Sequence, residues 1–317
     1  FSDQKSKIVP VHILAGKDNI EGFITLNSPE GWVIKPQSHS FSVEKKGDQS
    51  IVYFEVSPPK KISEGQLNPI IQIGEKTYDK ELHILDYKYI PLQQVLMKSE
   101  SKVVHLILQK KGENIGYIEG AGDSVPESLE QIGYQVTRIK PAEITYDKLV
   151  KFDAIVMGIR AYNTVPELEF KQVELIRYIE NGGNLILQYN TSHRLITKDI
   201  APFQIELSRD RVTDEFSEVS FLAPQHPILN YPNKISVNDF ENWVQERGLY
   251  FPNKWAKEFT PLLGMNDKNN KLTKGALLVA PYGKGYYIYT GISFFRELPA
   301  GVPGAYRLFA NMLSIGK

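Results

Sequence analysis

The chain has 317 residues, 42% of them hydrophobic and 11% aromatic, which is enough apolar material for about two globular domains of ~150 residues each. Lysine plus arginine equals aspartate plus glutamate at 37 each, so no overall field favours nucleic acid and no nucleic-acid partner is expected. The absence of cysteine excludes disulfides, thiolate metal ligands and cysteine nucleophiles. No apolar run approaches the ~20 residues of a transmembrane helix.

The first part of the chain has the pattern of short β-strands. Alternating apolar residues between turn residues predict strands over 8–15, 21–26, 40–43, 50–56, 68–73 and 80–84. This spacing predicts a β-sandwich of the immunoglobulin-like type over residues 1–87. Trp32 stands at a strand start, where a core position is favoured over a sugar-binding platform.

Residues 88–102 are predicted to form a linker, because Pro91 and the polar stretch Lys98-Ser-Glu-Ser-Lys102 interrupt the pattern. Beyond this segment the spacing of apolar residues changes. Strands are predicted over 103–108, 114–118, 134–139, 154–157 and 184–188, with helices over 126–132, 146–150 and 167–181 between them. Two further strands, 275–280 and 285–290, precede a closing helix over 304–313. Alternating strands and helices predict a flavodoxin-like doubly wound α/β domain over residues 103–317.

The loop Glu119-Gly-Ala-Gly-Asp123 joins a predicted strand to a predicted helix, which is the geometry that holds phosphate. Only two glycines fit the dinucleotide fingerprint, Val125 stands at the third position, and the carboxylate of Asp123 would repel a pyrophosphate. A tight turn is therefore favoured over nucleotide binding.

Two resemblances to known families follow from longer motifs. The segment Gly31-Trp32, with Pro36 and Lys46-Gly47, resembles the NEW3-type immunoglobulin-like modules found beside catalytic domains of carbohydrate-active proteins. The glycine loop with the segments Gly158-Ile-Arg-Ala-Tyr-Asn163 and Asn181-Gly-Gly-Asn184 resembles the class I glutamine amidotransferase-like superfamily. That superfamily carries a cysteine in an elbow after the strand that corresponds to 184–188, whereas this chain has Leu187-Gln-Tyr-Asn-Thr-Ser192 there. The resemblance therefore implies the fold without the ancestral chemistry.

The motifs Arg209-Asp-Arg-Val-Thr-Asp-Glu215, Phe240-Glu-Asn-Trp243 and Phe294-Phe-Arg-Glu297 extend the resemblance to the C-terminal region of Bacteroidetes PIG-L/LmbE-type deacetylases. That family implies a zinc-dependent N-acetylglucosamine deacetylase domain ahead of this region, and a periplasmic or secreted location. This chain has no His-Pro-Asp-Asp motif, so zinc is expected only in that N-terminal domain, with no cofactor and no catalytic residue here. Because the chain starts at Phe1, we expect a processed product or a piece of a longer protein.

Arg160, Tyr162 and Asn163 follow the predicted strand 154–157, at the edge where open α/β sheets bind ligands. Arg160 can bind a carboxylate or phosphate while Tyr162 stacks on a sugar, or Arg160 can anchor loops through Glu246 or Glu297. The sequence leaves both open. Asn190, in the segment that corresponds to the elbow, is a further candidate.

The last third of the chain holds the other candidate ligand-binding residues. They are Asp239, Glu241, Trp243, Glu246, Arg247, Arg296 and Glu297. The pair Asp239 and Glu241 is reminiscent of glycosidase carboxylates, but capping by Asp239 and ion pairing by Glu241 are favoured. Trp243 either lines a saccharide groove or packs on the sheet.

The sequence thus predicts a non-catalytic accessory region that binds glycan or positions its own N-terminal deacetylase domain. Two alternatives remain. One is a carbohydrate hydrolase that uses Asp239, Glu241 or His226, which requires these side chains to converge in a cleft. The other is a structural or oligomerisation scaffold, in which the arginine and aromatic clusters are buried against protein.

Overall fold

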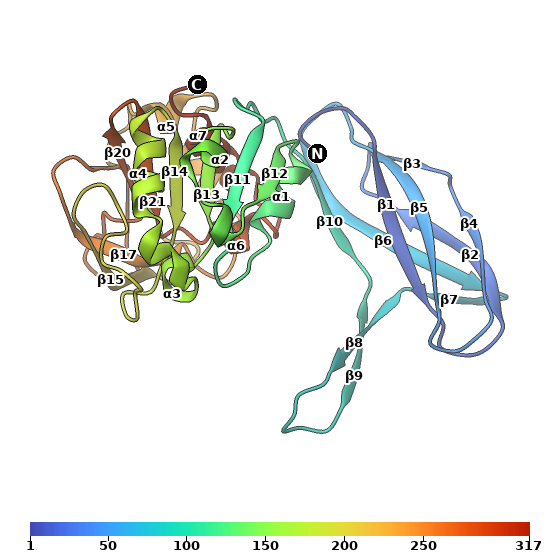
Figure 1. Cartoon of the computed structure of the whole chain (residues 1–317). Coiled ribbons are helices and arrows are strands. Elements are labelled where there is room, and N and C mark those ends of the chain that lie inside the picture. Colours follow the sequence, from blue (N-terminus) through green and yellow to red (C-terminus); the bar gives the residue numbers. More distant parts are fainter. The chain divides into compact units, whose positions relative to one another are not determined.

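The structure is a computed structural model of residues 1–317, and it divides into two compact units, residues 1–107 and 108–317 (Figure 1). The chain is strand-rich and mixes α and β elements in several sheets. None of its helices combines the length and the apolar character that crossing a lipid bilayer demands.

Unit 1 contains two antiparallel sheets that share one core. One sheet has the order β1 (Lys7–Leu14), β5 (Gln49–Ser57), β3 (Val33–Lys35). The other has the order β10 (Ser101–His105), β6 (Ser63–Ile73), β2 (Ile20–Asn27), β4 (His39–Val43), and β7 (Lys76–Tyr78) also pairs with β6. Trp32 is buried in this core and its indole N–H donates to Ser63 Oγ at 3.1 Å, which confirms its core position. The immunoglobulin-like assignment stays a prediction.

The end of unit 1 differs from the sequence-based expectation. The predicted strand 103–108 forms as β10, but it pairs antiparallel with β6 of the first unit. Val103 and His105 are buried on its inner face, and the Phe1 ammonium group donates to the Val104 carbonyl at 2.6 Å. The segment expected as a linker also contains β9 (Gln93–Lys98), which forms a hairpin with β8 (Lys80–Leu85). Every residue of these two strands is exposed.

Unit 2 is built on a seven-stranded sheet. Its order is β12 (Gln135–Arg138), β11 (Asn114–Ile118), β13 (Ala154–Met157), β14 (Asn184–Gln188), β21 (Gly285–Thr290), β20 (Leu277–Tyr282), β18 (Thr260–Pro261). The first five strands are parallel; β20 then pairs antiparallel with β21, and β18 pairs antiparallel with β20. Numbered along the chain, the parallel strands have the order 2-1-3-4-5, which defines a flavodoxin-like doubly wound sheet.

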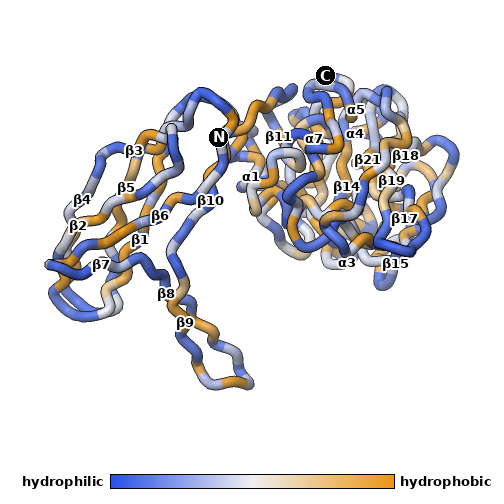
Figure 2. The backbone as a smooth tube through the Cα atoms, turned by 180° about the vertical axis from the view of Figure 1, so that it is seen from behind, coloured by the Kyte–Doolittle hydropathy of each residue, from blue (hydrophilic) through white to orange (hydrophobic).

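Helices cover both faces of this sheet. Alternate residues of a strand point to opposite faces, and Ile155, Leu185 and Tyr287 share one core cluster with Leu149 of α2 (Tyr146–Leu149) and Leu175 of α4 (Gln172–Glu180). On the other face lies α7 (Pro303–Ser314), whose last turn accepts hydrogen bonds from the buried Asn184 amide. The helix α1 (Val125–Gln131) contacts the edge strand β12. In Figure 2 the central strands are mainly hydrophobic, whereas the loops around α3 and β15 are mainly hydrophilic.

A long excursion lies between β14 and β20. It contains β15 (Ile205–Val212), β16 (Val219–Phe221), α5 (Pro227–Asn230), the 3₁₀ turn η3 (Val237–Phe240), β17 (Gly248–Trp255) and β19 (Leu263–Met265). β15 pairs with β17, and β16 pairs with β19, in two small antiparallel ribbons. The short helices α3 (Ala161–Thr164) and α6 (Phe294–Glu297) follow β13 and β21, and the 3₁₀ turns η1 (Pro141–Glu143) and η2 (Pro166–Phe170) precede α2 and α4.

The excursion packs tightly against the start of α7 at Gly304. A Cβ atom at Gly304 would lie 1.8 Å from the carbonyl oxygen of Asp239, a backbone atom that cannot move independently. We therefore expect Gly304→Ala to lower the free energy of unfolding by about 3 kcal/mol, the upper range for overpacked sites, in urea titrations. Gly264→Ala is the matched control, because its Cβ would meet only the Leu222 and Leu272 side chains, at 3.2–3.3 Å. Equal losses in the two variants would contradict the close approach.

Candidate functional site

The candidate site is the edge of the unit 2 sheet where the parallel strands end. Because β11, β13, β14 and β21 are parallel, the segments after Ile118, Met157, Gln188 and Thr290 meet there. Open α/β sheets bind ligands at this edge, most often at the switch point, which here lies between β11 and β13.

The glycine loop after β11 closes the switch point with its own hydrogen bonds. The Ala121 N–H donates to the Ile159 carbonyl at 2.8 Å, and the Ile159 N–H donates to the Asp123 carboxylate at 3.2 Å. Asp123 also accepts the Tyr117 hydroxyl at 2.6 Å, and a Cβ at Gly120 would lie 2.1 Å from the Ile159 oxygen. The loop is therefore a tight turn packed on its neighbour, as the sequence favours.

The ends of β13 and β14 are joined by residues that the sequence singled out. The Arg160 N–H donates to the Tyr189 carbonyl at 2.8 Å, while its side chain is exposed. The Asn163 side chain accepts from Thr191 N at 2.9 Å and donates to the His193 carbonyl at 3.2 Å. Asn163 thus holds the loop after β14 in place beside Arg160.

Asn190 is buried beneath this loop. Its side-chain oxygen accepts the Tyr162 N–H at 2.8 Å, and its amide donates to the Gln188 carbonyl at 3.0 Å. The segment that corresponds to the amidotransferase elbow is therefore held by an amide that has no free polar atom for a ligand.

An aromatic cluster lies at this edge, where Tyr189, only 7% exposed, packs against the partly exposed Tyr250 and Phe295 rings. Tyr189 stacks on Tyr250 with ring centroids 6.0 Å apart and lies 5.3 Å from the Phe295 ring. The His193 ring is 6.4 Å from Tyr250. Burial raises the pKa of Tyr189, and the positive charges of Arg160 and Arg296 oppose that rise. Aromatic rings and guanidinium groups thus lie close together at the carboxyl edge of the sheet.

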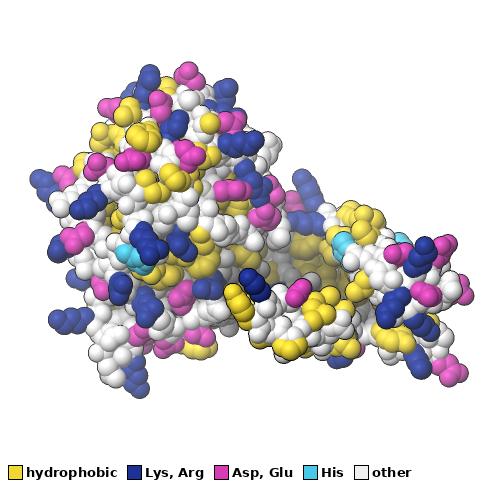
Figure 3. Space-filling model, turned by 60° about the horizontal axis from the view of Figure 1, so that its bottom comes forward, with side chains coloured by type: hydrophobic (Ala, Val, Ile, Leu, Met, Phe, Trp, Pro, Cys, Tyr) yellow, Lys and Arg dark blue, Asp and Glu magenta, His cyan; other side chains and the backbone are white.

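The loop that follows β14 also lines a groove. The groove has a volume of about 650 Å³ and is lined by Ser192, Leu195, Lys198 and residues 199–207. In Figure 3, which brings the bottom of Figure 1 forward, Lys and Arg side chains lie around a histidine next to hydrophobic atoms on unit 2.

Backbone strain is concentrated in the same segments. Five of the seven non-glycine residues with positive φ lie between 160 and 194 or between 242 and 250. They are Arg160 (57°), Arg194 (58°), Asn242 (57°), Gln245 (66°) and Tyr250 (54°). Such conformations cost about 1–3 kcal/mol each and cluster at ligand sites, where the surrounding structure holds them.

Arg247 and Glu297 lie buried behind this edge. The Arg247 guanidinium donates to the Phe240 carbonyl at 2.6 Å and to the Ser217 carbonyl at 2.9 and 3.1 Å. The Glu297 carboxyl accepts the Val244 N–H at 3.0 Å. Burial raises the pKa of Glu297 to about 8, although the Val244 hydrogen bond and the charge of Arg247 favour its ionised form. These two residues organise loops and offer no group to a ligand.

The carboxylate of Glu246 pairs with Arg296 and not with Arg160, the partner considered from the sequence. The carboxylate accepts from Arg296 Nε at 2.9 Å and from the Ser293 hydroxyl at 3.2 Å. Arg296 also lies over the Phe295 ring at 4.8 Å. Arg160 is therefore not the loop anchor for Glu246, and its side chain forms no ion pair within 4.0 Å.

Burial contradicts the ligand-binding roles considered for two aromatic residues, Tyr162 and Trp243. Tyr162 is fully buried and its hydroxyl accepts from Gln172, so it cannot stack on a sugar. Trp243 is 4% exposed, donates its indole N–H to the Asp239 carbonyl at 2.9 Å and stacks on Phe240. Trp243 therefore packs in the core of the excursion and does not line a groove.

The carboxylates considered for hydrolysis have different environments. Asp239 accepts from Ser236 N at 2.8 Å and from Arg307 Nε at 2.7 Å, so it caps η3 as the sequence favours. Glu241 is exposed. His226 accepts the Ile228 N–H through Nδ1 at 3.2 Å, and burial lowers its pKa. No group of three or more His, Asp or Glu side chains is placed to hold a metal ion.

The candidate site residues chosen from the sequence do not include Tyr189, His193, Tyr250 and Phe295. Tyr189 and His193 carry a usable signal, because they follow directly after a predicted parallel strand, at the same edge as Arg160. Tyr250 has no such signal, since it lies in β17 of the excursion.

The site and strand order define an α/β domain of the flavodoxin-like class with a cationic and aromatic carboxyl edge. No family model matches the chain, and no curated protein matches it. Among solved structures it is similar to the cytoplasmic protein STM1381 from Salmonella typhimurium LT2, with 12% identity over 63% of this chain and 98% of that one, at a TM-score of 0.44. It is also similar to a ThuA-like protein from Bacteroides uniformis, with 16% identity over 63% and 89% of the two chains, at a TM-score of 0.40. The fold class rests on the strand order of the chain itself.

The buried guanidinium of Arg247 gives a prediction for stability. Arg247→Ala leaves the Ser217 and Phe240 carbonyls without their donor and removes the cation near Glu297. We expect a loss of about 3 kcal/mol in the free energy of unfolding, measured by urea titration. Arg296→Ala is the control, because its more exposed ion pair is worth under about 1 kcal/mol. Similar losses for both arginines would refute the structural role of Arg247.

Glu297 gives a prediction for pH dependence. In the unfolded chain its pKa returns to about 4.3, so between that pH and about 8 the folded protein holds a proton that the unfolded chain has lost. The free energy of unfolding should therefore fall as pH rises through this interval and level off above it. Glu297→Gln should lack this component while keeping an acceptor for Val244. Thermal unfolding of both proteins from pH 5 to pH 9 measures it, and parallel curves would rule it out.

Proposed function

We propose that this chain is a non-catalytic accessory region of a PIG-L/LmbE-type deacetylase and that it binds saccharide at the carboxyl edge of unit 2. The exposed Arg160, whose N–H is bound to the Tyr189 carbonyl, together with the partly exposed Tyr250 and Phe295 rings that pack on Tyr189, is the observation that carries the proposal. Aromatic faces bind the apolar faces of sugar rings, and a guanidinium donates to hydroxyl or carboxylate oxygens.

The geometry of the edge supports binding rather than hydrolysis. The carboxylates of Asp239 and Glu297 accept hydrogen bonds from their own loops, and the pKa of Glu297 is raised by burial in the interior. Arg160, Arg194 and Tyr250 are instead held in strained backbone conformations at this edge. Rigid placement of binding groups reduces the entropy lost when a ligand binds.

The resemblance to PIG-L/LmbE-type deacetylases gives the proposed roles of the two units and of the N-terminal domain. In this proposal, zinc and the deacetylation step belong to an N-terminal catalytic domain, unit 1 is an immunoglobulin-like module, and unit 2 holds the glycan for that domain. The location that the resemblance implies, periplasmic or secreted, suits a glycan substrate.

The test is thermal unfolding of the full chain with N-acetylated and deacetylated saccharides. Ligand at ~100 times Kd should stabilise the folded state by about 2.7 kcal/mol, which raises Tm by about 5–10 °C for a domain of this size. Arg160→Ala should abolish this shift without lowering the Tm of the free protein, because the Arg160 side chain is exposed and forms no ion pair.

Arg177→Ala is the matched control, since this exposed arginine lies in α4 over the Tyr146 ring, outside the edge site. It should keep the full shift. If no saccharide raises Tm, or if both variants respond as the parent does, saccharide binding at this edge is rejected. Loss of folding in Arg160→Ala would favour the scaffold interpretation.

A further inference from the structure

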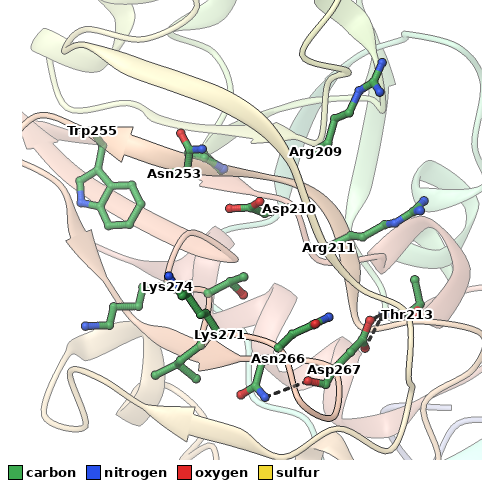
Figure 4. Close-up of a pocket in the computed structure, with 14 residues that line it drawn as sticks. Arg209, Asp210, Arg211, Thr213, Asn253, Trp255, Asn266, Asp267, Lys271 and Lys274 are labelled. Atoms are coloured by element: carbon green, nitrogen blue, oxygen red, sulfur yellow. Dashed lines mark hydrogen bonds between the residues drawn. The ribbon is translucent and has the colours of Figure 1, made fainter.

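A second groove of unit 2 lies between the β15–β17 ribbon and the loop 266–274 (Figure 4). Its volume is about 740 Å³, and its lining includes residues 209–211 of the motif Arg209-Asp-Arg-Val-Thr-Asp-Glu215, which the carboxyl edge does not use. In the figure Trp255 and Arg211 lie on opposite sides of the groove, with Asp210 between them.

Irregular pairing brings successive polar residues of β15 into this groove. The register with β17 shifts between Glu206 and Leu207, between Leu207 and Asp210, and between Asp210 and Val212. Ser208 stabilises the second of these shifts, because its hydroxyl donates to the Phe251 carbonyl at 2.7 Å and accepts the Asp210 N–H at 2.8 Å. Bulges of this kind redirect side chains and are frequent beside binding sites.

The opposite wall is held in place by one carboxylate. Asp267 accepts from Thr213 N at 2.8 Å, from the Thr213 hydroxyl at 2.9 Å and from Asp214 N at 2.9 Å. Burial opposes its ionisation, but these hydrogen bonds and the charge of Arg211 lower its pKa below the usual value. The loop is also closed by paired hydrogen bonds between Met265 and Thr273. The groove is therefore preformed.

The lining is cationic although the whole chain is neutral. It contains four cations, Arg209, Arg211, Lys271 and Lys274, and two carboxylates, Asp210 and Asp267, a difference of two positive charges. None of the four cations forms an ion pair within 4.0 Å. Three side-chain amides, Asn253, Asn266 and Asn270, complete the polar lining, and the partly exposed ring of Trp255 is the aromatic surface.

We propose that this groove is a binding site for an acidic oligosaccharide, separate from the site at the carboxyl edge. The unpaired cations bind carboxylate or sulfate groups, the amides bind hydroxyls, and the Trp255 ring packs against a sugar face. The volume of the groove, about 740 Å³, and its four cations favour a chain of acidic units over a single small anion.

The test is titration calorimetry of the full chain with an oligogalacturonate hexamer, a heparin-derived hexasaccharide, neutral cellohexaose and hexaglutamate. At least one acidic saccharide should bind, and which one binds distinguishes carboxylate from sulfate as the anionic group. The double variant K271Q/K274Q should weaken this binding about tenfold or more, since each lost charge-assisted hydrogen bond is worth about one factor of ten. Lys268→Gln is the matched control, because this exposed lysine belongs to the same loop but does not line the groove.

Four results would overturn the proposal. They are failure of both acidic saccharides to bind, equal binding of cellohexaose, equal binding of hexaglutamate, and equal weakening by Lys268→Gln. The Arg160→Ala variant separates the two sites: it should leave acidic saccharide binding unchanged, and loss of that binding would assign the ligand to the carboxyl edge instead. K271Q/K274Q should in turn leave any neutral saccharide binding at the edge unchanged.

Discussion

The buried guanidinium of Arg247 is the interaction on which the candidate site depends. Its side chain joins the carbonyls of Ser217 and Phe240, and its own N–H donates to Val212 while its carbonyl accepts from Ser293. One residue thus connects the end of β15, the turn η3 and the segment that follows β21. A buried cation is costly unless its donors are satisfied, so these loops have one low-energy arrangement around it.

This arrangement determines which polar groups remain available at the surface. Glu297 lies close enough to feel the charge of Arg247, but its carboxyl group is used by the Val244 N–H. Val244 and Gln245 are thereby held near Arg296, and Arg296 in turn is held by Glu246. Arg160 has no such partner. The edge therefore contains a rigid interior network and, outside it, a free cation beside stacked aromatic rings.

The regular part of unit 2 could be predicted from sequence because its signals are local. Strands 114–118, 154–157 and 184–188 are short apolar runs next to amphipathic helices, and the structure has them at the same residues. The position of Arg160 at the carboxyl edge follows from that pattern alone. The boundary of unit 1 was placed too early because the pairing of β10 with β6 joins residues about 40 positions apart, and no local pattern specifies such a partner.

The excursion between β14 and β20 shows why the remaining site residues were harder to predict. Composition identified Trp243, Arg247 and Glu297 as unusual, but it could not separate an aromatic residue that packs inside from one that faces a ligand. Tyr162 and Tyr189 illustrate the same ambiguity, since both follow parallel strands and only the second stacks on Tyr250 at the edge. What separates them is the hydrogen bonding of their neighbours. Gln172 and Asn190 hydrogen-bond Tyr162 in the interior, whereas the Tyr189 ring, which is 7% exposed, packs against the partly exposed Tyr250 and Phe295 rings. Whether an aromatic side chain is buried therefore depends on how the loops pack together. Arg247 holds the loops of the excursion through its hydrogen bonds to Ser217, Phe240, Val212 and Ser293.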